Sequence, residues 1–205
     1  ARDFIALLQK HLRLKGLVVG PNFALGKGRE GNVTTLQRLS TEMGFQLLVV
    51  PHLTQGKEVV SSTAIRKALS TGAMASVTRM LGKPYSLSGP VISGKERGRV
   101  LGFPTANLEV NHNRAIPADG VYVTRAYIGD KSYQSVTNIG QCPTFGGSEQ
   151  TIEVFLLDYS GDLYNQTLKI ELLERLRAEK CFENPQELQK QIAQDIEKAR
   201  MLLVG

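Results

Sequence analysis

The pattern of predicted secondary structure changes once along this chain, at Gly82-Lys83-Pro84. Before that point, stretches with helical periodicity alternate with short apolar runs, which predicts helices alternating with strands. The expected helices cover about 2–13, 32–43, 62–70 and 73–81, and the expected strands cover 17–20 and 45–50. Such alternation favours a parallel sheet. We therefore expect residues 1–83 to form part of a Rossmann-like α/β domain.

After the change of pattern, residues 84–205 show short runs separated by turn signals, which is typical of a small antiparallel barrel or sandwich. Strands are expected at about 120–129, 132–139, 151–158 and 167–173. Asn184 and Pro185 suit the N-cap and the first position of a final helix, and the apolar stripe of that helix should pack on the core. The second domain is thus expected to be a β domain followed by a C-terminal helix.

Charge is distributed unevenly between the two predicted domains. Residues 1–83 contain 12 Lys and Arg against 4 Asp and Glu, whereas residues 84–205 contain 13 against 15. Basic chains often bind phosphates or nucleic acid. Aromatic residues make up 6% of the chain and Trp is absent, so a stacking platform for single-stranded nucleic acid is poorly supplied. We expect a small-molecule phosphate ligand of nucleotide size and no nucleic-acid partner, and the oligomeric state stays open.

The sequence also argues against a membrane span, a secretory signal and a zinc site. No stretch reaches about 18 uninterrupted apolar residues and no signal-peptide pattern opens the chain, so we expect a cytoplasmic protein with no membrane partner. Cys142 and Cys181 have no CxxC spacing, which predicts two reduced thiols. His11, His52 and His112 form no paired ligand motif, so zinc is not expected.

The most informative stretch for function runs from Gly94 to Asn107 and reads Gly-Lys-Glu-Arg-Gly-Arg-Val-Leu-Gly-Phe-Pro-Thr-Ala-Asn. Its glycines permit turns and close approach to a ligand, and its basic side chains supply charge for phosphate. If residues 105–107 are extended, the Thr105 hydroxyl and the Asn107 amide oxygen point to the same side. Two such neutral oxygens suit a magnesium ion that takes its other ligands from water and phosphate. From these residues alone, a basic hairpin loop followed by an ordinary edge strand is an equal alternative.

Four other segments carry candidate chemistry, each with a plainer alternative. Residues 61–66 fit either an anion-binding helix start or an ordinary Ser/Thr N-cap. Glu153 shares a predicted strand face with Phe155, so it is either a general base or a solvated carboxylate. Residues 176–182 are either a charged connection or a loop that closes over a ligand. The GxGxxG match at 26–31 lacks the strand spacing and the acidic residue of a dinucleotide site, which favours a turn or another basic ligand loop.

Several sequence motifs follow one another after residue 84. They are GxxRGRxLGFPTAN at 94–107, PxxGVY at 117–122, NIGxxPTF at 138–145, a Glu-bearing strand ending in LLDY at 153–159, DLY at 162–164 and LRxExxF at 176–182. In content and in order they resemble the riboflavin kinase module. Residues 20–26 and 60–66 resemble the adenylyltransferase module of the bacterial bifunctional riboflavin kinase/FMN adenylyltransferases, also called FAD synthetases. The resemblance implies a partial Rossmann-like nucleotidyltransferase domain over 1–83 and a riboflavin kinase β-barrel with a C-terminal helix over 84–205.

The resemblance also implies ATP-dependent phosphorylation of riboflavin to FMN, with Mg²⁺ as cofactor and ATP as co-substrate. It makes Glu153 the catalytic base and makes Thr105 and Asn107 the magnesium ligands. The implied ATP-binding residues are Gly94, Lys95, Arg97, Gly98, Arg99 and Gly102, and the implied flavin-binding residues are Arg177, Glu179 and Phe182. In the first module the implied nucleotide-binding residues are Asn22, Ser62, Thr63 and Arg66. A non-catalytic flavin- or nucleotide-binding fragment of a larger assembly is the alternative.

Adenylylation of FMN to FAD depends, in the family that the chain resembles, on an HxGH-type motif on the first strand, and this sequence contains none. Asn22 also stands where that family usually has Asp. The chain opens with Ala1 and passes directly into a helical pattern, as if cut into a domain already under way. We therefore expect the riboflavin kinase reaction without formation of FAD.

Overall fold

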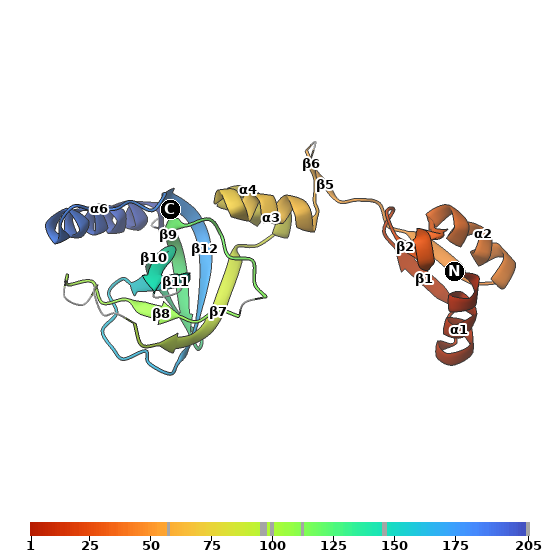
Figure 1. The fold of residues 1–205 in the computed structure, drawn as a ribbon, viewed down its shortest axis with the longest axis horizontal. Coiled ribbons are helices and arrows are strands. Elements are labelled where there is room, and N and C mark those ends of the chain that lie inside the picture. Colours follow the sequence, from red (N-terminus) through yellow and green to blue (C-terminus); the bar gives the residue numbers. More distant parts are fainter. Residues whose placement is uncertain (57, 95–97, 99–100, 112, 145–146, 204–205) are drawn as a thin grey trace. The chain divides into compact units, whose positions relative to one another are not determined.

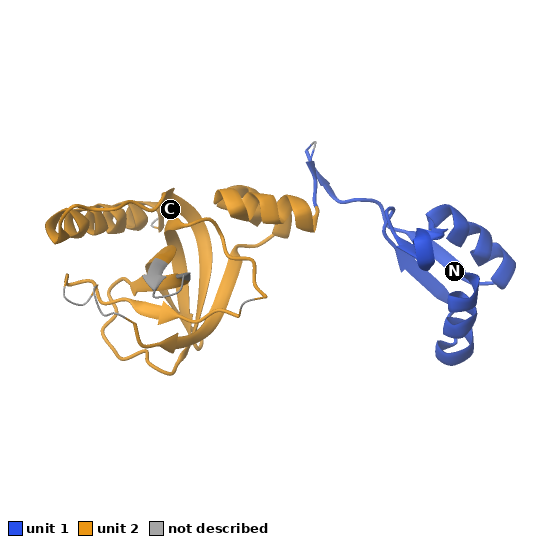
Figure 2. Ribbon diagram, in the orientation of Figure 1, with its two compact units in different colours: residues 1–60 blue, residues 61–205 orange. Residues whose placement is uncertain are grey.

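The computed structural model describes residues 1–56, 58–94, 98, 101–111, 113–144 and 147–203. The chain divides into two compact units, Ala1–Val60 and Ser61–Gly205, which Figure 2 shows in different colours. Each unit has its own hydrophobic core. In the described part of the chain, no helix combines the length and the apolar character that a membrane span requires.

The first unit contains a pair of parallel strands and two helices (Figure 1). Its elements are α1 (Arg2–Leu12), β1 (Gly16–Val19), β2 (Ala24–Leu25), the 3-10 turn η1 (Lys27–Arg29), β3 (Gly31–Asn32), α2 (Val33–Met43), β4 (Gln46–Val49), β5 (Thr54–Gln55) and β6 (Glu58–Val59). β1 and β4 pair in parallel, which confirms the α/β pattern read from the sequence. The core of this unit is formed by Ile5, Val19, Leu36, Leu39 and Phe45.

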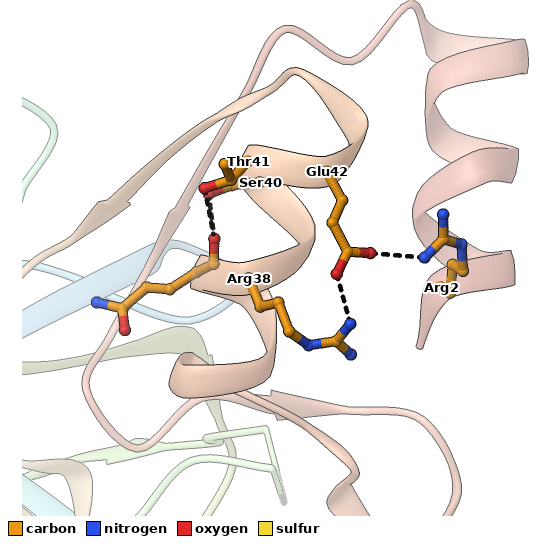
Figure 3. Close-up of polar contacts among 6 residues, drawn as sticks. Arg2, Arg38, Ser40, Thr41 and Glu42 are labelled. Atoms are coloured by element: carbon orange, nitrogen blue, oxygen red, sulfur yellow. Dashed lines mark hydrogen bonds and ion pairs between the residues drawn. The ribbon is translucent and has the colours of Figure 1, made fainter.

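The ends and the packing of α2 follow from a few polar groups. The Asn32 side chain caps its start by accepting a backbone N–H at 3.0 Å, and Gly44 ends it with a left-handed φ of 72°. Glu42 then joins the two helices, because it accepts hydrogen bonds from Arg2 of α1 and from Arg38 of α2, both at 2.6 Å (Figure 3). The helix predicted at 32–43 is thus confirmed, together with its glycine stop.

The second unit is a closed antiparallel barrel, followed by a helix. Its strands are β7 (Tyr85–Ile92), β8 (Ala106–Leu108), β9 (Gly120–Ile128), β10 (Lys131–Thr144), β11 (Gly147–Leu156) and β12 (Thr167–Arg177), in the barrel order β10-β11-β8-β7-β12-β9. Alternate residues of each strand fill the interior, as Ile152, Val154 and Leu156 do on β11. The four strands expected from the sequence are present, and the arrangement is a barrel and not a sandwich.

Two short helices, α3 (Ser62–Thr71) and α4 (Met74–Leu81), belong to the second unit. Leu69, Met74 and Val77 are buried in the same cluster as the barrel interior. Arg175 of β12 also donates a hydrogen bond to the carbonyl of Thr71 at 3.4 Å. The compact units therefore divide at residues 60/61, whereas the sequence pattern changes at 83/84. This division describes packing, and the boundary between the two family modules at 83/84 stays a prediction.

Helix α6 (Pro185–Leu203) covers part of the outer wall of the barrel (Figure 1). The Asn184 side chain accepts the backbone N–H of Glu187 at 2.9 Å, so the predicted N-cap is confirmed. Further along the helix, Ala199 is buried with Val121 and Val136, which lie on the outer face of β9 and β10. This packing leaves the first half of α6 beside the strands that carry the candidate site.

Candidate active site

A row of polar side chains crosses the outer face of the barrel on three neighbouring strands. Asn138 on β10 is the register partner of Glu153 on β11, and Glu153 is in turn the partner of Asn107 on β8. The Cβ atoms of directly opposed residues lie about 4.5–5.5 Å apart, so these side chains are neighbours. Because Ile152 and Val154 point into the barrel, Glu153 faces outward, where it is half-buried. A carboxylate therefore stands between two amides.

Thr105, which directly precedes β8, belongs to the same group. Its hydroxyl donates to Glu153 Oε2 at 3.4 Å, a long hydrogen bond. Since Ala106 is buried in the barrel core, Thr105 and Asn107 lie on the outer side of β8. The sequence predicted that these two side chains share one side, and the structure brings both beside Glu153.

Glycines of the preceding loop lie directly against this group. A Cβ atom at Gly94 would overlap the side-chain amide of Asn107, and one at Gly98 would overlap the carbonyl oxygen of Phe103 and lie 3.2 Å from Thr105 Oγ1. Gly102 has a φ of +83°, which L residues rarely adopt. Close approach therefore explains why two of these positions are glycine. The other predicted ATP-binding residues, Lys95, Arg97 and Arg99, lie outside the described residues.

A cavity of about 370 Å³ opens beside Glu153. Its walls are the outer face of the barrel, the first half of α6 and the segment that joins β12 to α6. Phe103 and Phe155 meet edge to face in this wall, with their ring centroids 5.7 Å apart. Leu188 and Ile192, which the sequence assigned to the packing stripe of the last helix, also line the cavity. The cavity wall thus combines aromatic and apolar side chains with polar and charged ones, and the carboxylate of Glu153 is among the latter.

The three predicted flavin-binding residues all line this cavity. Arg177 ends β12, and Glu179 and Phe182 follow in the connecting segment 178–184. The Arg177 guanidinium lies 5.8 Å from the centroid of the Phe182 ring, within the range of a cation–π contact. The carboxylate of Glu179 lies so close to the backbone of Gly140 that a Cβ atom there would overlap it. The sequence motif therefore corresponds to a continuous piece of cavity wall.

A second cavity, of about 520 Å³, shares Thr105 and Phe155 with the first. The loop of residues 159–164 forms its far wall, and Tyr159 of this loop meets Tyr133 edge to face at 5.1 Å. The backbone N–H of Tyr164 is held by the Asp162 side chain at 2.9 Å. Thr105 therefore stands where two cavities meet, which gives room for two ligands whose ends approach one another.

The residues predicted for a second nucleotide site fall in different units. In the first unit, Asn22 Nδ2 lies 3.2 Å from His52 Nε2, and Arg29 donates to the Asn22 carbonyl at 3.0 Å. In the second unit, the Ser61 hydroxyl caps α3 by accepting the N–H of Ala64 at 3.2 Å. Ser62, Thr63 and Arg66 are in the first turns of that helix. Among the residues that the structure describes, no group of three His, Cys, Asp or Glu could hold a metal ion.

Sequence reasoning assigned no role to three residues that the structure makes prominent. Asn138 belongs to a motif that was recognised, but its place beside Glu153 depends on the register of β10 and β11. Asp195 lines the cavity from an apolar helix face, where the helical pattern alone indicated core packing. His52 approaches Asn22 through the fold, across 30 positions of sequence.

Comparisons with known proteins agree with the two-part motif pattern. A family model described as riboflavin kinase matches residues 81–203, and one described as FAD synthetase matches residues 1–64. The bifunctional riboflavin kinase/FMN adenylyltransferase of Escherichia coli K12 is 41% identical over 197 residues, and that of Bacillus subtilis 168 is 36% identical over 192 residues. These alignments cover 95% and 92% of this chain but 63% and 60% of the relatives. The chain thus spans somewhat less than two thirds of their length.

A solved structure gives the corresponding three-dimensional likeness. A crystal structure described as a macrolide-efflux protein from Streptococcus pneumoniae matches 98% of this chain with a TM-score of 0.87 and 32% sequence identity. The match covers 64% of that other chain.

Proposed function

This chain belongs to the riboflavin kinase family, and we propose on that premise that it transfers the γ-phosphoryl group of ATP to the 5′-hydroxyl of riboflavin. One observation carries the proposal. Glu153 stands between Asn107 and Asn138 and beside Thr105, at the wall of a cavity that also contains aromatic side chains. A protein that only binds flavin needs no carboxylate placed among oxygen ligands in this way. The alternative of a non-catalytic binding fragment is therefore less well supported.

Riboflavin would occupy the 370 Å³ cavity. Phe182 offers a flat apolar surface to the isoalloxazine ring, and Arg177 and Glu179 offer polar groups to its edge. The ribityl chain would then run toward Glu153, so that its terminal hydroxyl comes within hydrogen-bond reach of the carboxylate. The hydroxyl to be phosphorylated thereby lies beside Thr105.

ATP would occupy the 520 Å³ cavity, with its phosphates directed toward Thr105. The close packing of Gly94 on Asn107 and of Gly98 near Thr105 supports a phosphate-binding role for this loop, because glycine lets the backbone approach a ligand. Lys95, Arg97 and Arg99 would add positive charge around the same phosphates. The two substrates then meet at the residues that the two cavities share.

Thr105 and Asn107 fit a magnesium ion, because they present two neutral oxygen donors side by side on the outer face of β8. A bound Mg²⁺ supplies positive charge to the phosphate oxygens during transfer. Gly94 leaves room for the Asn107 amide in this position, because a Cβ atom at residue 94 would overlap it. The hydroxyl of Thr105 donates its hydrogen to Glu153, and a hydroxyl oxygen that donates its hydrogen still has lone pairs with which it can bind a cation.

Glu153 would act as the general base. It accepts the proton of the riboflavin 5′-hydroxyl while that oxygen forms a bond to the γ-phosphorus of ATP. The bond between this phosphorus and the bridging oxygen of ADP breaks, and ADP leaves with its electron pair. Catalysis of this kind depends mainly on position and charge, which explains why the site residues come from adjoining barrel strands.

Incubation of the 205-residue chain with riboflavin, ATP and Mg²⁺ tests the proposal, with separation of the flavin products by chromatography. We expect FMN and ADP in equal amounts, and no FMN when Mg²⁺ is removed by chelation. Binding of riboflavin without any FMN, under every divalent metal tried, would favour the non-catalytic alternative.

The same chain should form no FAD from FMN and ATP. Adenylyl transfer needs donors that stabilise charge on the α-phosphate and on departing pyrophosphate, and the sequence contains no His-x-Gly-His motif. In the part of the chain that the structure describes, His52 is the histidine that lies beside a predicted nucleotide-binding residue, Asn22. The measurement is release of FAD and pyrophosphate, and robust formation of both would show that other groups replace the motif.

A further inference from the structure

Helix α6 carries a buried carboxylate on the face that packs against the barrel. Asp195 is 2% exposed and lies one turn before the buried Ala199. Burial of a charge is costly unless the charge is paired and hydrogen-bonded. Its partners are Arg177, at the end of β12, and Gln191, one turn earlier in the same helix.

The contacts fix the plane of the Arg177 guanidinium. Arg177 Nε donates to Asp195 Oδ2 at 2.9 Å, and Nη2 of the same guanidinium lies 2.8 Å from that oxygen. Gln191 holds Asp195 Oδ1 at 3.1 Å, and Arg177 Nη1 donates to the carbonyl of Ala178 at 3.1 Å. Arginine that is held through several N–H groups has little freedom to rotate.

The fixed guanidinium contacts the segment that covers the cavity. Its Cζ atom lies 5.8 Å from the Phe182 ring centroid, and Asp195, Arg177 and Phe182 all line the 370 Å³ cavity. Residues 178–184 contain no helix or strand, so their position depends on a few side-chain contacts. The contacts that join this segment to the barrel strands include Glu179 against Gly140 and Arg177 against the Phe182 ring. Lys180 of the same segment also lies over that ring, 5.5 Å from its centroid.

We propose that Asp195 is a positioning residue for riboflavin: it holds Arg177 in the orientation that keeps Phe182 and the segment 178–184 over the cavity. The inference rests on the proposed function in naming riboflavin as the occupant. Without the carboxylate, Arg177 turns toward water and Phe182 loses its contact with the end of β12. Lys180 stays beside the ring, but it belongs to the same segment and cannot hold that segment to the barrel, so the segment samples more conformations. Riboflavin binding must then also order this segment, and the conformational entropy that is lost weakens the affinity.

The simpler explanation is that Asp195 only attaches α6 to the barrel, and a second ion pair of the same helix offers a control. Arg200 of α6 forms an ion pair with Asp158, which follows β11, through two contacts of 2.8 and 2.7 Å. This pair also joins α6 to the barrel, but neither residue lines the cavity. The side chain of Asp158 is 71% exposed and that of Asp195 is 3% exposed, so this pair controls only for the loss of a polar contact between α6 and the barrel. The double-mutant cycle below distinguishes attachment from positioning.

The experiment compares Asp195→Asn with Asp158→Asn in the full 205-residue chain. Riboflavin affinity is measured by flavin fluorescence, at a temperature where circular dichroism shows both variants folded. We expect Asp195→Asn to raise the riboflavin Kd about tenfold, as for a lost hydrogen bond to a charged group, with the KM for ATP unchanged. Asp158→Asn should change the Kd less than about twofold. Equal effects of the two substitutions would overturn the positioning role.

A double-mutant cycle with Phe182→Leu makes the test independent of overall stability. If Asp195 acts through Phe182, the effect of Asp195→Asn is largely lost once Phe182 has been replaced. Additive effects would overturn the proposal. If Asp195→Asn does not fold, Arg177→Lys serves instead, because it keeps the charge pair but removes the planar guanidinium. An unaltered riboflavin Kd in Arg177→Lys would likewise overturn the proposal. Binding is measured without turnover, so a chain that binds riboflavin but makes no FMN contradicts the kinase reaction alone.

Discussion

The two units differ in how completely their strands are covered. The strands of the second unit close into a barrel, whereas β1 and β4 of the first unit leave one face open: Val18 and Leu48, which are register partners, are 65% and 60% exposed. Parallel strands are normally buried on both faces. Nine of the fourteen large hydrophobic side chains that are exposed in the described part of the chain belong to residues 1–60. The smaller unit therefore has the weaker basis for stability.

The candidate site residues of the two units also differ in how firmly the fold supports them. Asn107, Glu153 and Asn138 lie on paired strands of the closed barrel, where register holds each side chain beside the next. Asn22 and His52 of the first unit both lie in exposed loops that follow strands. Chemistry that depends on position requires rigid support, so the comparison predicts that phosphoryl transfer resides in the barrel alone.

Substitution at Glu153 tests that prediction most strongly. Glu153→Gln keeps the shape of the side chain but removes the base, and a positioned base typically contributes about 10²–10⁴-fold to the rate. We expect kcat for FMN formation to fall by that factor while riboflavin affinity changes little. Steady-state kinetics with separation of the products measure both quantities.

The matched change in the other unit is Asn22→Ala, which should leave the rate of FMN formation as it is. A Glu153→Gln chain with unaltered turnover would remove this carboxylate from the mechanism. A large loss of FMN formation in Asn22→Ala would show that the first unit takes part in the kinase reaction.

The sequence predicted the local parts of the site well, because local rules determine them. Thr105 and Asn107 share one side of an extended segment through the period of two, and Asn184 caps α6 as its side chain and position indicated. Asn138 and Asp195 could not be assigned in this way. The role of the first depends on strand register, and the role of the second depends on which helix face meets β12.

The packing partner of the helices α3 and α4 was also beyond local rules. Periodicity showed correctly that 62–81 is helical, and it grouped these helices with the preceding strands because the pattern is continuous there. In the structure, Leu69, Met74 and Val77 are buried with the barrel interior. Which apolar faces meet is decided by tertiary packing, and no spacing within one helix reveals it.

Core truncations sharpen the comparison of stability. Leu36 and Ile170 are both 0% exposed, the first in the core of residues 1–60 and the second in the barrel. Replacement of either by Ala should cost about 2–5 kcal/mol through lost burial and a cavity. Leu36→Ala should lower the unfolding temperature of the first unit and spare FMN formation, whereas Ile170→Ala should lower that of the barrel and the thermal limit of the kinase together.

Thermal unfolding followed by circular dichroism, with FMN formation assayed after each heating step, separates these outcomes. We expect two transitions, with the first unit unfolding at the lower temperature. A single transition that shifts equally in both variants would show that the units unfold as one cooperative body, and it would contradict the comparison.

The smallest expected effect concerns one exposed ion pair in each unit. Hydrogen bonds from Arg38 and Arg2 hold the pKa of Glu42 below its ordinary value of 4.5, and Arg200 likewise holds the pKa of Asp158 below 3.8. A carboxyl group whose pKa is lower in the folded state stabilises the fold above its unfolded pKa. For Glu42 the contribution is complete above about pH 4.5, and for Asp158 it is complete above about pH 3.8. It is lost as the pH falls from there through the lower pKa that each group has in the folded state.

Glu42→Gln should therefore weaken only the first unit, and Asp158→Asn only the second, each more at pH 7 than at pH 3. Both carboxylates are exposed, so the losses should be small and should shrink further in about 1 M salt, where charges are screened within about 3 Å. Denaturant titrations of each transition at the two pH values measure them. A destabilisation of equal size at pH 7 and pH 3 would mean that packing of the side chain, and not its charge, supports the fold. A loss that appears in both transitions would mean that the two units share stability, which their separate cores do not predict.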